Sequence, residues 1–585
     1  MRSPQRGVIL PTVLFILVLL GLLVAIFAFR VNADLAATQA VTYRFQTRLA
    51  AEAGVERVKL MLRSGRDDVD LWYHNPEELH RIIVWGHDTD PAVWGTNEEF
   101  GDAEMTYRFS IVADDPSDAE KFVRFGITDE SAKLNLNVAT EDQLFILVGE
   151  AVRDDEELNA GEIVDAILDW RDADAEPRGE GGDTETEYYR SLDKPYLVKN
   201  GPFDTVEELL LVKGVTPYVL YGEDYDRNGL LSANEDDGDK SFPPDNEDGL
   251  LNRGLYPYLT VYSYEQNISN DNRPRIYLFG DEPTLRAQLA EEFEGEPEIV
   301  EYMVQATRGA QGAGAGGPND NTGNAGAPEG SNNDNAGAAG GSGNEKRRTR
   351  QQVKPEDEDE TGDTDPSTEI DEEDQESGEE PVEAEESDAD DGAEEEANEP
   401  GADETDDETE GSRPIVSPAS LMRDRSVDGE LVPSPLGWQH LAKLLDRTTT
   451  VAADKGPIRG LINVSTAPRE VLRCLEALSE EQIDRIVTTR VLLGSAEKAT
   501  AAWLVTEEIV DMDTFELIAP NITARGRQFT IEALGYADHF GMVSRIQVIV
   551  DMLGPIAQPV YYRDLTGLGG HYPIRETDLE TFRVR

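Results

Sequence analysis

The chain has 585 residues and a formal net charge of −67 at pH 7, from 52 lysine and arginine against 119 aspartate and glutamate residues. This acidic excess argues against nucleic acid as a partner, because binding phosphates requires a basic face. The single cysteine, Cys474, excludes an intrachain disulfide. Its place on the apolar side of a predicted helix favours a buried, unreactive thiol.

The N-terminus combines a short basic leader, MRSPQRG, with an uncharged apolar run over residues 8–29. The run is long enough to cross the hydrocarbon core of a bilayer. Arg2 and Arg6 precede it, so the positive-inside rule predicts a cytoplasmic N-terminus and an exported remainder. A simple membrane anchor accounts for these features, whereas a cleavable signal peptide would have a shorter apolar region and a small-residue cleavage site.

The last residue of the leader supports a more specific interpretation. A basic leader ending in Gly7 resembles the prepilin-peptidase site of type IV pilin-like proteins, which implies cleavage after Gly7 and leaves Val8 as the first mature residue. Apolar residues continue at helical spacing to about residue 64, which predicts one helix about 85 Å long. Most pilin-like subunits carry glutamate at the fifth mature position, where it pairs with a neighbour's N-terminal amine. Thr12 in that position suits a tip subunit, but it is equally a tolerated polar residue in a membrane helix.

The exported part shows strand patterns at both ends and helical patterns between them. The segments EMTYRFSIVAD and KFVRFGIT predict strands before the helical part, and RQFTIEALGYA and MVSRIQVIVDM predict a closing hairpin after it. Between these, LNLNVATEDQL (134–144) and INVSTAPREVL (462–472) align without gaps, which predicts two related helical units. A weaker echo at 275–289 requires a one-residue shift and is given little weight.

A long low-complexity segment separates the two halves. Residues 309–344 are rich in Gly, Ala and Asn, and residues 356–410 hold about 31 acidic residues and no basic one. Such a composition cannot bury enough apolar surface to offset the entropy of the chain. We therefore predict a disordered linker over 305–412.

The segment DYDRNGLLSANE (224–235) fits the template of a calcium-binding loop. Glu235 at position twelve can bind bidentately, Gly229 supplies the sharp turn, and Leu230 supplies a backbone carbonyl. Side-chain oxygens fall at positions one, three, five and nine: Asp224, Asp226, Asn228 and Ser232. The alternative is an acidic surface loop that fits by chance. No clear second helix follows, so we expect a structural calcium site and not a full helix–loop–helix hand.

Other candidate sites carry weaker signals. A second metal site formed by Asp172, Asp174 and Glu187 is as well supported as a solvated acidic loop. The segment VEELLLVKGV resembles a helix–hairpin–helix turn, but Lys213 stands among acidic neighbours, which favours a structural turn over a phosphate contact. The six histidines are scattered and no nucleophile motif is present, so we expect no enzymatic activity.

The order of several short motifs resembles minor pseudopilin K of the type II secretion system, the general secretion pathway protein K family. These motifs are the Gly-ended leader, AAEAGVERVKLML, DESAKLNLNVATEDQL, ILDWRDADAEP and VEELLLVKGV, and the resemblance covers 1–220 and 455–550. It implies an α+β fold in which a long N-terminal pilin-like helix packs on a small antiparallel sheet. A mainly helical domain of helix–hairpin–helix or SAM-like units is inserted, and members of the family carry calcium in this domain.

The expected organisation follows from these patterns. It comprises a prepilin leader (1–7), a transmembrane and spine helix (8–65), a pilin-like β region (66–128), a helical domain with the calcium loop (129–304), the linker (305–412), a second helical unit (413–520), closing strands (521–553) and a tail (554–585).

The expected function is that of a non-enzymatic tip subunit of the type II secretion pseudopilus, which supports its assembly and protein export across the outer membrane. The resemblance implies a single-pass protein of the inner membrane with most of the chain in the periplasm. Prepilin peptidase and other minor pseudopilins, docked along the N-terminal helix, are the expected partners. Two alternatives remain open: a membrane-anchored DNA receptor that uses the helix–hairpin–helix turn, and a calcium-stabilised adhesin.

Overall fold

The structure is a computed structural model. It describes residues 9–86, 106–114, 123–153, 158–174, 176–178, 185–240, 242–246, 248–312, 413–427, 429–537, 540–554, 556–569 and 572. Gly7 and Val8, the predicted cleavage site, lie outside these residues.

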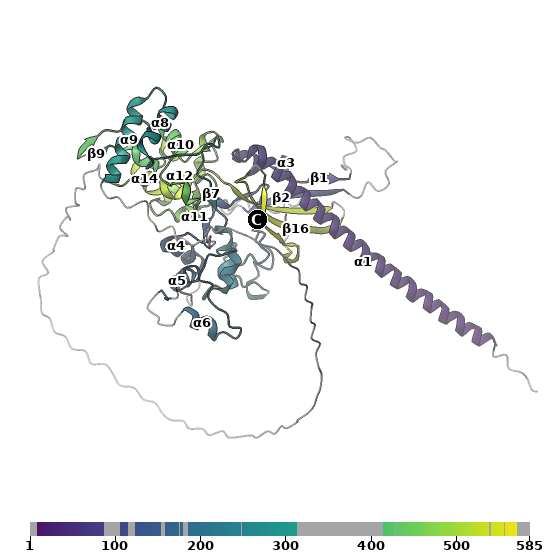
Figure 1. The fold of residues 1–585 in the computed structure, drawn as a ribbon. Coiled ribbons are helices and arrows are strands. Elements are labelled where there is room, and N and C mark those ends of the chain that lie inside the picture. Colours follow the sequence, from purple (N-terminus) through teal and green to yellow (C-terminus); the bar gives the residue numbers. More distant parts are fainter. Residues whose placement is uncertain are drawn as a thin grey trace, which may run out of the picture. The chain divides into compact units, whose positions relative to one another are not determined.

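The N-terminal helix α1 (Ile9–Gly65) has two halves of different character (Figure 1). Its first half is exposed and apolar, and an 18-residue window of the helix has a mean hydropathy of 3.1, so by length and composition the helix is able to cross a membrane. In its second half, Ala51, Val55, Val58 and Leu62 are buried at helical spacing. The single long helix predicted from residue 8 to about 64 is therefore confirmed for the described residues.

An antiparallel sheet of seven strands receives the second half of α1. The sheet runs in the order β1 (Ile82–Trp85), β2 (Tyr107–Asp114), β15 (Gln528–Ala537), β16 (Phe540–Asp551) and β17 (Gln558–Asp564), with β3 (Val123–Arg124) paired to β2 and β4 (Thr128–Asp129) paired to β15. The helical part of the chain leaves the sheet after β4 and returns at β15. The expected α+β fold with an inserted helical part is therefore what the described residues show.

The contact between α1 and the sheet is close enough to require glycine. Phe109, Ile111, Phe529 and Ile531 fill the space between them. At Gly535 on β15, an added Cβ would lie 1.9 Å from the backbone carbonyl oxygen of Thr47 on α1. The backbones of helix and strand meet there without a side chain between them.

The helical part contains three units with one plan, which we call units A, B and C. Each unit begins with a short strand, continues with a pair of helices and ends with a short strand that pairs in parallel with the first. Unit A has β5 (Leu134–Asn135), α4 (Glu141–Ala151), α5 (Ala160–Arg171) and β6 (Leu259–Thr260). Unit B has β8 (Ile276–Tyr277), α8 (Glu282–Glu292), α9 (Pro297–Gly312) and β11 (Thr448–Thr449). Unit C has β13 (Ile462–Asn463), α11 (Arg469–Arg473), α12 (Glu480–Thr489) and β14 (Ile522–Thr523).

The same two hydrogen bonds close each unit. A backbone N–H just after the first strand donates to a threonine carbonyl in the last: Leu136 to Thr260 at 2.8 Å, Leu278 to Thr449 at 2.9 Å and Val464 to Thr523 at 3.1 Å. The hydroxyl oxygen of that threonine accepts the N–H two residues further on: from Tyr262 at 3.0 Å, Val451 at 3.1 Å and Arg525 at 3.2 Å. The weak echo at 275–289 therefore marks a third unit, where the sequence predicted two.

Two predicted boundaries are wrong in the described residues. The linker was expected from residue 305, but α9 continues to Gly312. Residues 554–585 were expected to be a tail, yet β17 adds an edge strand to the sheet there. The remaining predicted linker, 313–412, lies outside the described residues and falls within unit B.

The other described elements complete the connections. They are α2 (Val69–Trp72), α3 (Pro76–Leu79), α6 (Glu185–Ser191), α7 (Pro217–Tyr221), α10 (Trp438–Arg447), α13 (Trp503–Thr506), α14 (Met512–Ile518), the hairpin β9 (Arg425–Val427) and β10 (Glu430–Val432), and the pair β7 (Tyr264–Glu265) and β12 (Ile458–Arg459). Short 3-10 helices join several of them.

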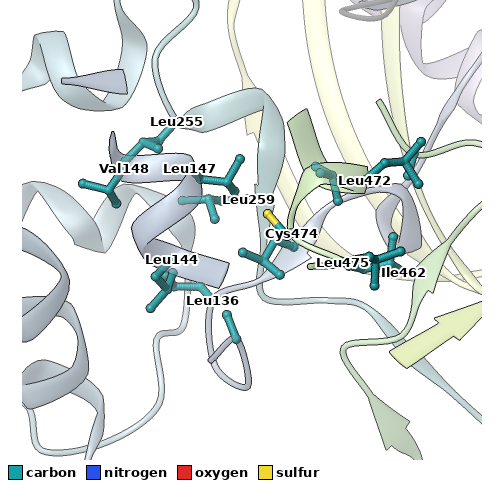
Figure 2. Packing of buried hydrophobic residues seen from close by; sticks show 14 of the residues in the cluster. Leu136, Leu144, Leu147, Val148, Leu255, Leu259, Ile462, Leu472, Cys474 and Leu475 are labelled. Atoms are coloured by element: carbon teal, nitrogen blue, oxygen red, sulfur yellow. The ribbon is translucent and has the colours of Figure 1, made fainter. Parts of the chain in front are cut away.

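Units A and C share one core, and the single cysteine lies in it. Figure 2 shows Cys474 of unit C among leucines of both units, including Leu144, Leu147 and Leu472. The cysteine is buried, and burial raises the pKa of its thiol to about 12. Because the thiolate is the reactive form, the prediction of a buried, unreactive thiol agrees with this environment.

Candidate calcium-binding loop

The loop 224–235 follows the short helix α7 directly. Thr216 caps the start of α7 by accepting the N–H of Val219, and Gly222 ends it with a φ of +60°. After Glu235 the described chain continues into a 3-10 helix (Gly238–Lys240) and not an α-helix. The expected absence of a second long helix after the loop therefore agrees with the described residues.

Three of the predicted ligands converge. One carboxylate oxygen from each of Asp224, Asp226 and Glu235 lies within 4.8 Å of the others. Among the described residues these three form the single group of this kind. Asp224 and Glu235 are buried and Asp226 is half-buried, so the carboxylates repel one another in a setting with little water to screen them.

Hydrogen bonds within the loop hold its backbone in a turn around these carboxylates. The Asp224 carboxylate accepts the N–H groups of Asn228 at 2.9 Å and of Gly229 at 3.0 Å. The Asn228 side chain accepts the N–H of Leu230 at 2.6 Å. Gly229 has a φ of +69°, in the left-handed region where glycine is favoured. Gly229, at position six of the template, thus adopts the backbone conformation that the sharp turn of the loop requires.

Glu235 gives an independent sign that a cation fits here. Its Oε2 accepts the N–H of Ser232 at 2.9 Å, whereas its Oε1 is buried and has no hydrogen-bond partner. A buried carboxylate oxygen without a donor is costly. Burial raises the pKa of Glu235 to about 7, and burial followed by the nearby Asp114 and Asp226 raises that of Asp224 to about 8.

The donor set suits a hard cation. Calcium prefers six to eight oxygen ligands, and the loop offers three carboxylates with amide, hydroxyl and carbonyl oxygens at the template positions. The structure brings the carboxylates of Asp224, Asp226 and Glu235 together. The other ligands stay predictions: the Asn228 side chain, the Leu230 carbonyl and the Ser232 hydroxyl.

The surroundings of the loop include residues that the sequence did not reveal. Arg545 of β16 donates to the carbonyl oxygen of Asp226, and Arg253 donates to that of Gly229. Arg253 also pairs with Asp114, at the end of β2. Arg545 lies more than 300 residues from the loop and Asp114 more than 100, and no local pattern in the chain could have indicated their contacts.

A second segment, NEDGLLN (246–252), repeats part of the loop geometry. The N–H of Asp248 donates to Asn246 Oδ1 at 3.0 Å, and that of Leu250 donates to Asp248 Oδ1 at 2.6 Å. Gly249 has a φ of +71°. The sequence held a signal for this likeness, because NGLLS in the loop corresponds to DGLLN here.

The second predicted metal site is not brought together in this way, although Asp172 Oδ1 is likewise buried without a hydrogen-bond partner. Asp172, Asp174 and Glu187 do not form a group of converging ligands within the described residues. Arg178 lies 3.7 Å from the Asp172 carboxylate, where a cation would otherwise have to bind. This site stays a prediction.

The segment predicted to form a helix–hairpin–helix turn begins with a 3-10 helix (Val206–Leu211), and the residues that follow contact other parts of the same chain. The Lys213 ammonium lies 5.4 Å from the centre of the Tyr188 ring, and the Lys213 N–H donates to the Tyr189 hydroxyl at 3.2 Å. At Gly214, whose φ is +81°, an added Cβ would lie 2.8 Å from Ile163. The turn packs against α5, as expected of a structural element.

The fold and the loop together define the class of the protein. It is an α+β protein with an N-terminal helix apolar enough to span a membrane, an antiparallel sheet that receives the end of this helix, and an inserted helical part. Within this class, residues 127–221 match the family described as type II secretion system (T2SS), protein K. The resemblance to minor pseudopilin K is thereby confirmed on this segment, which runs from β4 to α7.

Two further comparisons give little beyond this match. No curated protein matches the chain. Among solved structures, the chain is similar to one chain of the GspK-GspI-GspJ complex from the enterotoxigenic Escherichia coli type 2 secretion system. The two chains are 9% identical, the match covers 92% of this chain and 99% of the other, and the TM-score is 0.35. At this identity and TM-score the likeness supports no statement about partners.

Proposed function

We propose that the chain is a non-enzymatic minor pseudopilin at the tip of the type II secretion pseudopilus. The observation that carries the proposal is the division of α1 into an exposed apolar half and a half that packs on the sheet, together with the family match of residues 127–221. The first half anchors the subunit in the inner membrane, and the second half holds the folded part in the periplasm. The subunit primes pseudopilus assembly and so supports protein export across the outer membrane.

Exposed apolar residues on α1 favour other minor pseudopilins as partners. Beyond the predicted membrane run, Leu35, Val41 and Phe45 remain exposed on the helix. Large apolar side chains left exposed along a helix are available for a protein or membrane contact. The neighbouring helices of other pilin-like subunits are the occupants we propose for this surface. Thr12 supports a tip position, because it offers no carboxylate for a neighbour's N-terminal amine.

Calcium has a structural role in this proposal. Asp224, Asp226, Asn228, Ser232 and Glu235 would hold the ion with the carbonyl of Leu230, and the ion would supply the positive charge that these converging carboxylates lack. The periplasmic side is open to external calcium, so a weak site suffices there. A loop of this kind stabilises one shape and does not sense a signal.

The N-terminus provides the test of the pseudopilin proposal. We expect the protein recovered from cells with active prepilin peptidase to begin at Val8, and Gly7→Leu to retain Met1 and to block secretion of the cargo. The matched control is Gly7→Ala, which keeps a small residue and should retain partial processing. Recovery of wild-type protein that still begins at Met1 in such cells would overturn the proposal.

Thermal unfolding provides the test of the calcium site. Adding calcium to EDTA-treated protein at about 100 times the dissociation constant should stabilise it by about 2.7 kcal/mol, because the ion binds the folded chain alone. Asp224→Ala should abolish the rise in melting temperature, and Asp454→Ala, at an exposed position, should preserve it. An equal rise in wild type and Asp224→Ala would show that calcium binds elsewhere.

A further inference from the structure

A buried arginine of the sheet holds the backbone of the calcium loop. Arg545 lies on β16 and is 2% exposed. Its Nη1 donates to the carbonyl oxygen of Asp226 at 2.6 Å and its Nη2 donates to that of Arg227. Its Nε donates to Glu532 on the neighbouring strand β15, at 2.5 Å. The guanidinium therefore divides its donors between the sheet and the loop.

One of the two carbonyls belongs to a residue whose side chain would bind the ion. Asp226 and Arg227 occupy positions three and four. The Asp226 carboxylate lies among the converging ligands, while its own carbonyl oxygen accepts from Arg545. The same residue thus contacts the ligand cluster with its side chain and the sheet with its backbone. A movement of the Asp226 backbone would therefore shift both groups, because both are attached to one Cα.

A second arginine repeats this arrangement from another direction. Arg253 donates through Nη2 to the carbonyl oxygen of Gly229 at 3.2 Å, and its Nη1 lies 3.4 Å from Asp114 Oδ1 at the end of β2. An added Cβ on Gly229 would lie 2.7 Å from the same Asp114 oxygen. The sheet therefore approaches the loop at its turn, and the backbone carbonyls of residues 226, 227 and 229 accept from guanidinium groups.

The burial of Arg545 makes these contacts strongly coupled. A buried cation that loses its hydrogen-bond acceptors is costly, because water cannot replace them. Without a cation, repulsion among Asp224, Asp226 and Glu235 favours an open loop. An open loop would take two acceptors from Arg545 and leave it with Glu532. When a bound cation neutralises the carboxylates, the closed loop is favoured both by the ion and by the hydrogen bonds from Arg545.

We propose that calcium binding to the loop is coupled to the seating of the loop on the sheet, with Arg545 as the positioning residue and Arg253 as a second link. The inference rests on the calcium site of the proposed function. Coupling of this kind is reciprocal: the ion strengthens the contact between the helical part and the sheet, and that contact raises the affinity for the ion. The ion then fastens two parts of the subunit that are joined by long chain segments.

The test compares two buried arginines, Arg545 on β16 and Arg527 directly before β15, in the full-length protein in detergent micelles. Calcium affinity is measured by isothermal titration calorimetry after treatment with EDTA. We expect Arg545→Gln to weaken binding by roughly tenfold, although it removes no ligand. Arg527 is the matched control, since it is also 2% exposed but donates to Asp67 at 2.8 Å. Arg527→Gln should lower the melting temperature and leave the affinity within twofold of wild type.

Hydrogen exchange of the wild-type protein gives a measurement that does not depend on a variant. Adding calcium should slow exchange of amides in β15 and β16 around residues 532 and 545 as well as in the loop. Unchanged affinity in Arg545→Gln, or calcium protection confined to 224–235, would overturn the coupling while leaving the calcium site in place. Absence of calcium binding by wild type would overturn both the site and the coupling, whereas N-terminal processing at Val8 would still be expected.

Discussion

Gly535 has no room for a side chain, because the carbonyl of Thr47 would lie 1.9 Å from its Cβ. We expect Gly535→Ala to separate α1 from the sheet and to lower the free energy of unfolding by about 3 kcal/mol or more. Gly541 on β16 is the control, since an added Cβ there meets nothing within 4 Å. Chemical unfolding of both variants measures the difference. Similar losses in the two would mean that strand propensity, and not the close approach, is responsible.

The pH dependence of the calcium-free protein follows from two loop carboxylates. The pKa of Asp224 is raised from 3.8 to about 8 and that of Glu235 from 4.5 to about 7, in both cases first by burial. A raised pKa means that the folded state binds the proton more tightly than the unfolded chain. The resulting stability is fully present below about pH 4 and is lost as the pH rises through 7 to 8.

In EDTA, the urea midpoint should therefore be higher at pH 6 than at pH 8.5. Asp224→Asn should reduce this difference, since the amide does not titrate in this range. A midpoint that rises between pH 6 and pH 8.5 would contradict the environment described for these carboxylates.

At the scale of elements, the closing threonine of each unit can be compared across the three copies. Thr260 and Thr523 also donate to buried glutamates, Glu130 and Glu265 respectively, whereas the Thr449 hydroxyl accepts the N–H of Val451. Thr449→Val should then cost about 1 kcal/mol, and Thr260→Val or Thr523→Val about 2 kcal/mol, because a glutamate also loses a donor. Thr→Ser in each position should recover most of the loss. Equal costs for all three Thr→Val variants, measured by urea unfolding, would contradict this order.

The elements that could be predicted from the sequence are those specified by local pattern. The helical spacing of α1 and the alternation in β15 and β16 are local, and so is the glycine turn of the calcium loop. Unit B was given little weight for two reasons. The low-complexity segment separates residues 276 and 449, and two residues, instead of three, lie between Leu278 and the helix cap at Asp281. The strand β17 was not predicted because its sequence does not alternate between apolar and polar residues. Its polar residues and Pro559 are tolerated because it lies at the edge of the sheet.

In the candidate site, the ligands within the loop could be predicted from the sequence, but the residues that contact the loop from elsewhere in the chain could not. Spacing alone placed Asp224, Asp226 and Glu235 around one point, because the template fixes positions within twelve residues. Arg545, more than 300 residues away, enters the site through the pairing of β16 with β15. Contacts of this range depend on the tertiary fold, which no local pattern encodes.

At the scale of the whole molecule, the segment 313–412 is an insertion within unit B. Its two ends are attached to neighbouring elements, since an added Cβ on Gly309 of α9 would lie 3.2 Å from the carbonyl of Ser426 on β9. Replacing the segment with a Gly/Ser bridge of roughly 20 residues should leave calcium affinity unchanged. It should raise stability by about 1 kcal/mol, because a shorter loop loses less entropy on closure. Loss of folding in this variant, judged by thermal unfolding, would mean that the segment contributes contacts of its own.

The position of β15 between β2 and β16 has a consequence for the order in which the protein forms. α1 emerges first during synthesis, but its buried face packs on strands that end at residue 551. Until β15 and β16 emerge, Val55, Val58 and Leu62 can pack on β2 but not on the strands beside it, so the complete core waits for contacts of very long sequence separation. In a prematurely terminated chain, the apolar face of α1 that packs on β15 and β16 would therefore stay exposed, and the chain would be open to proteolysis.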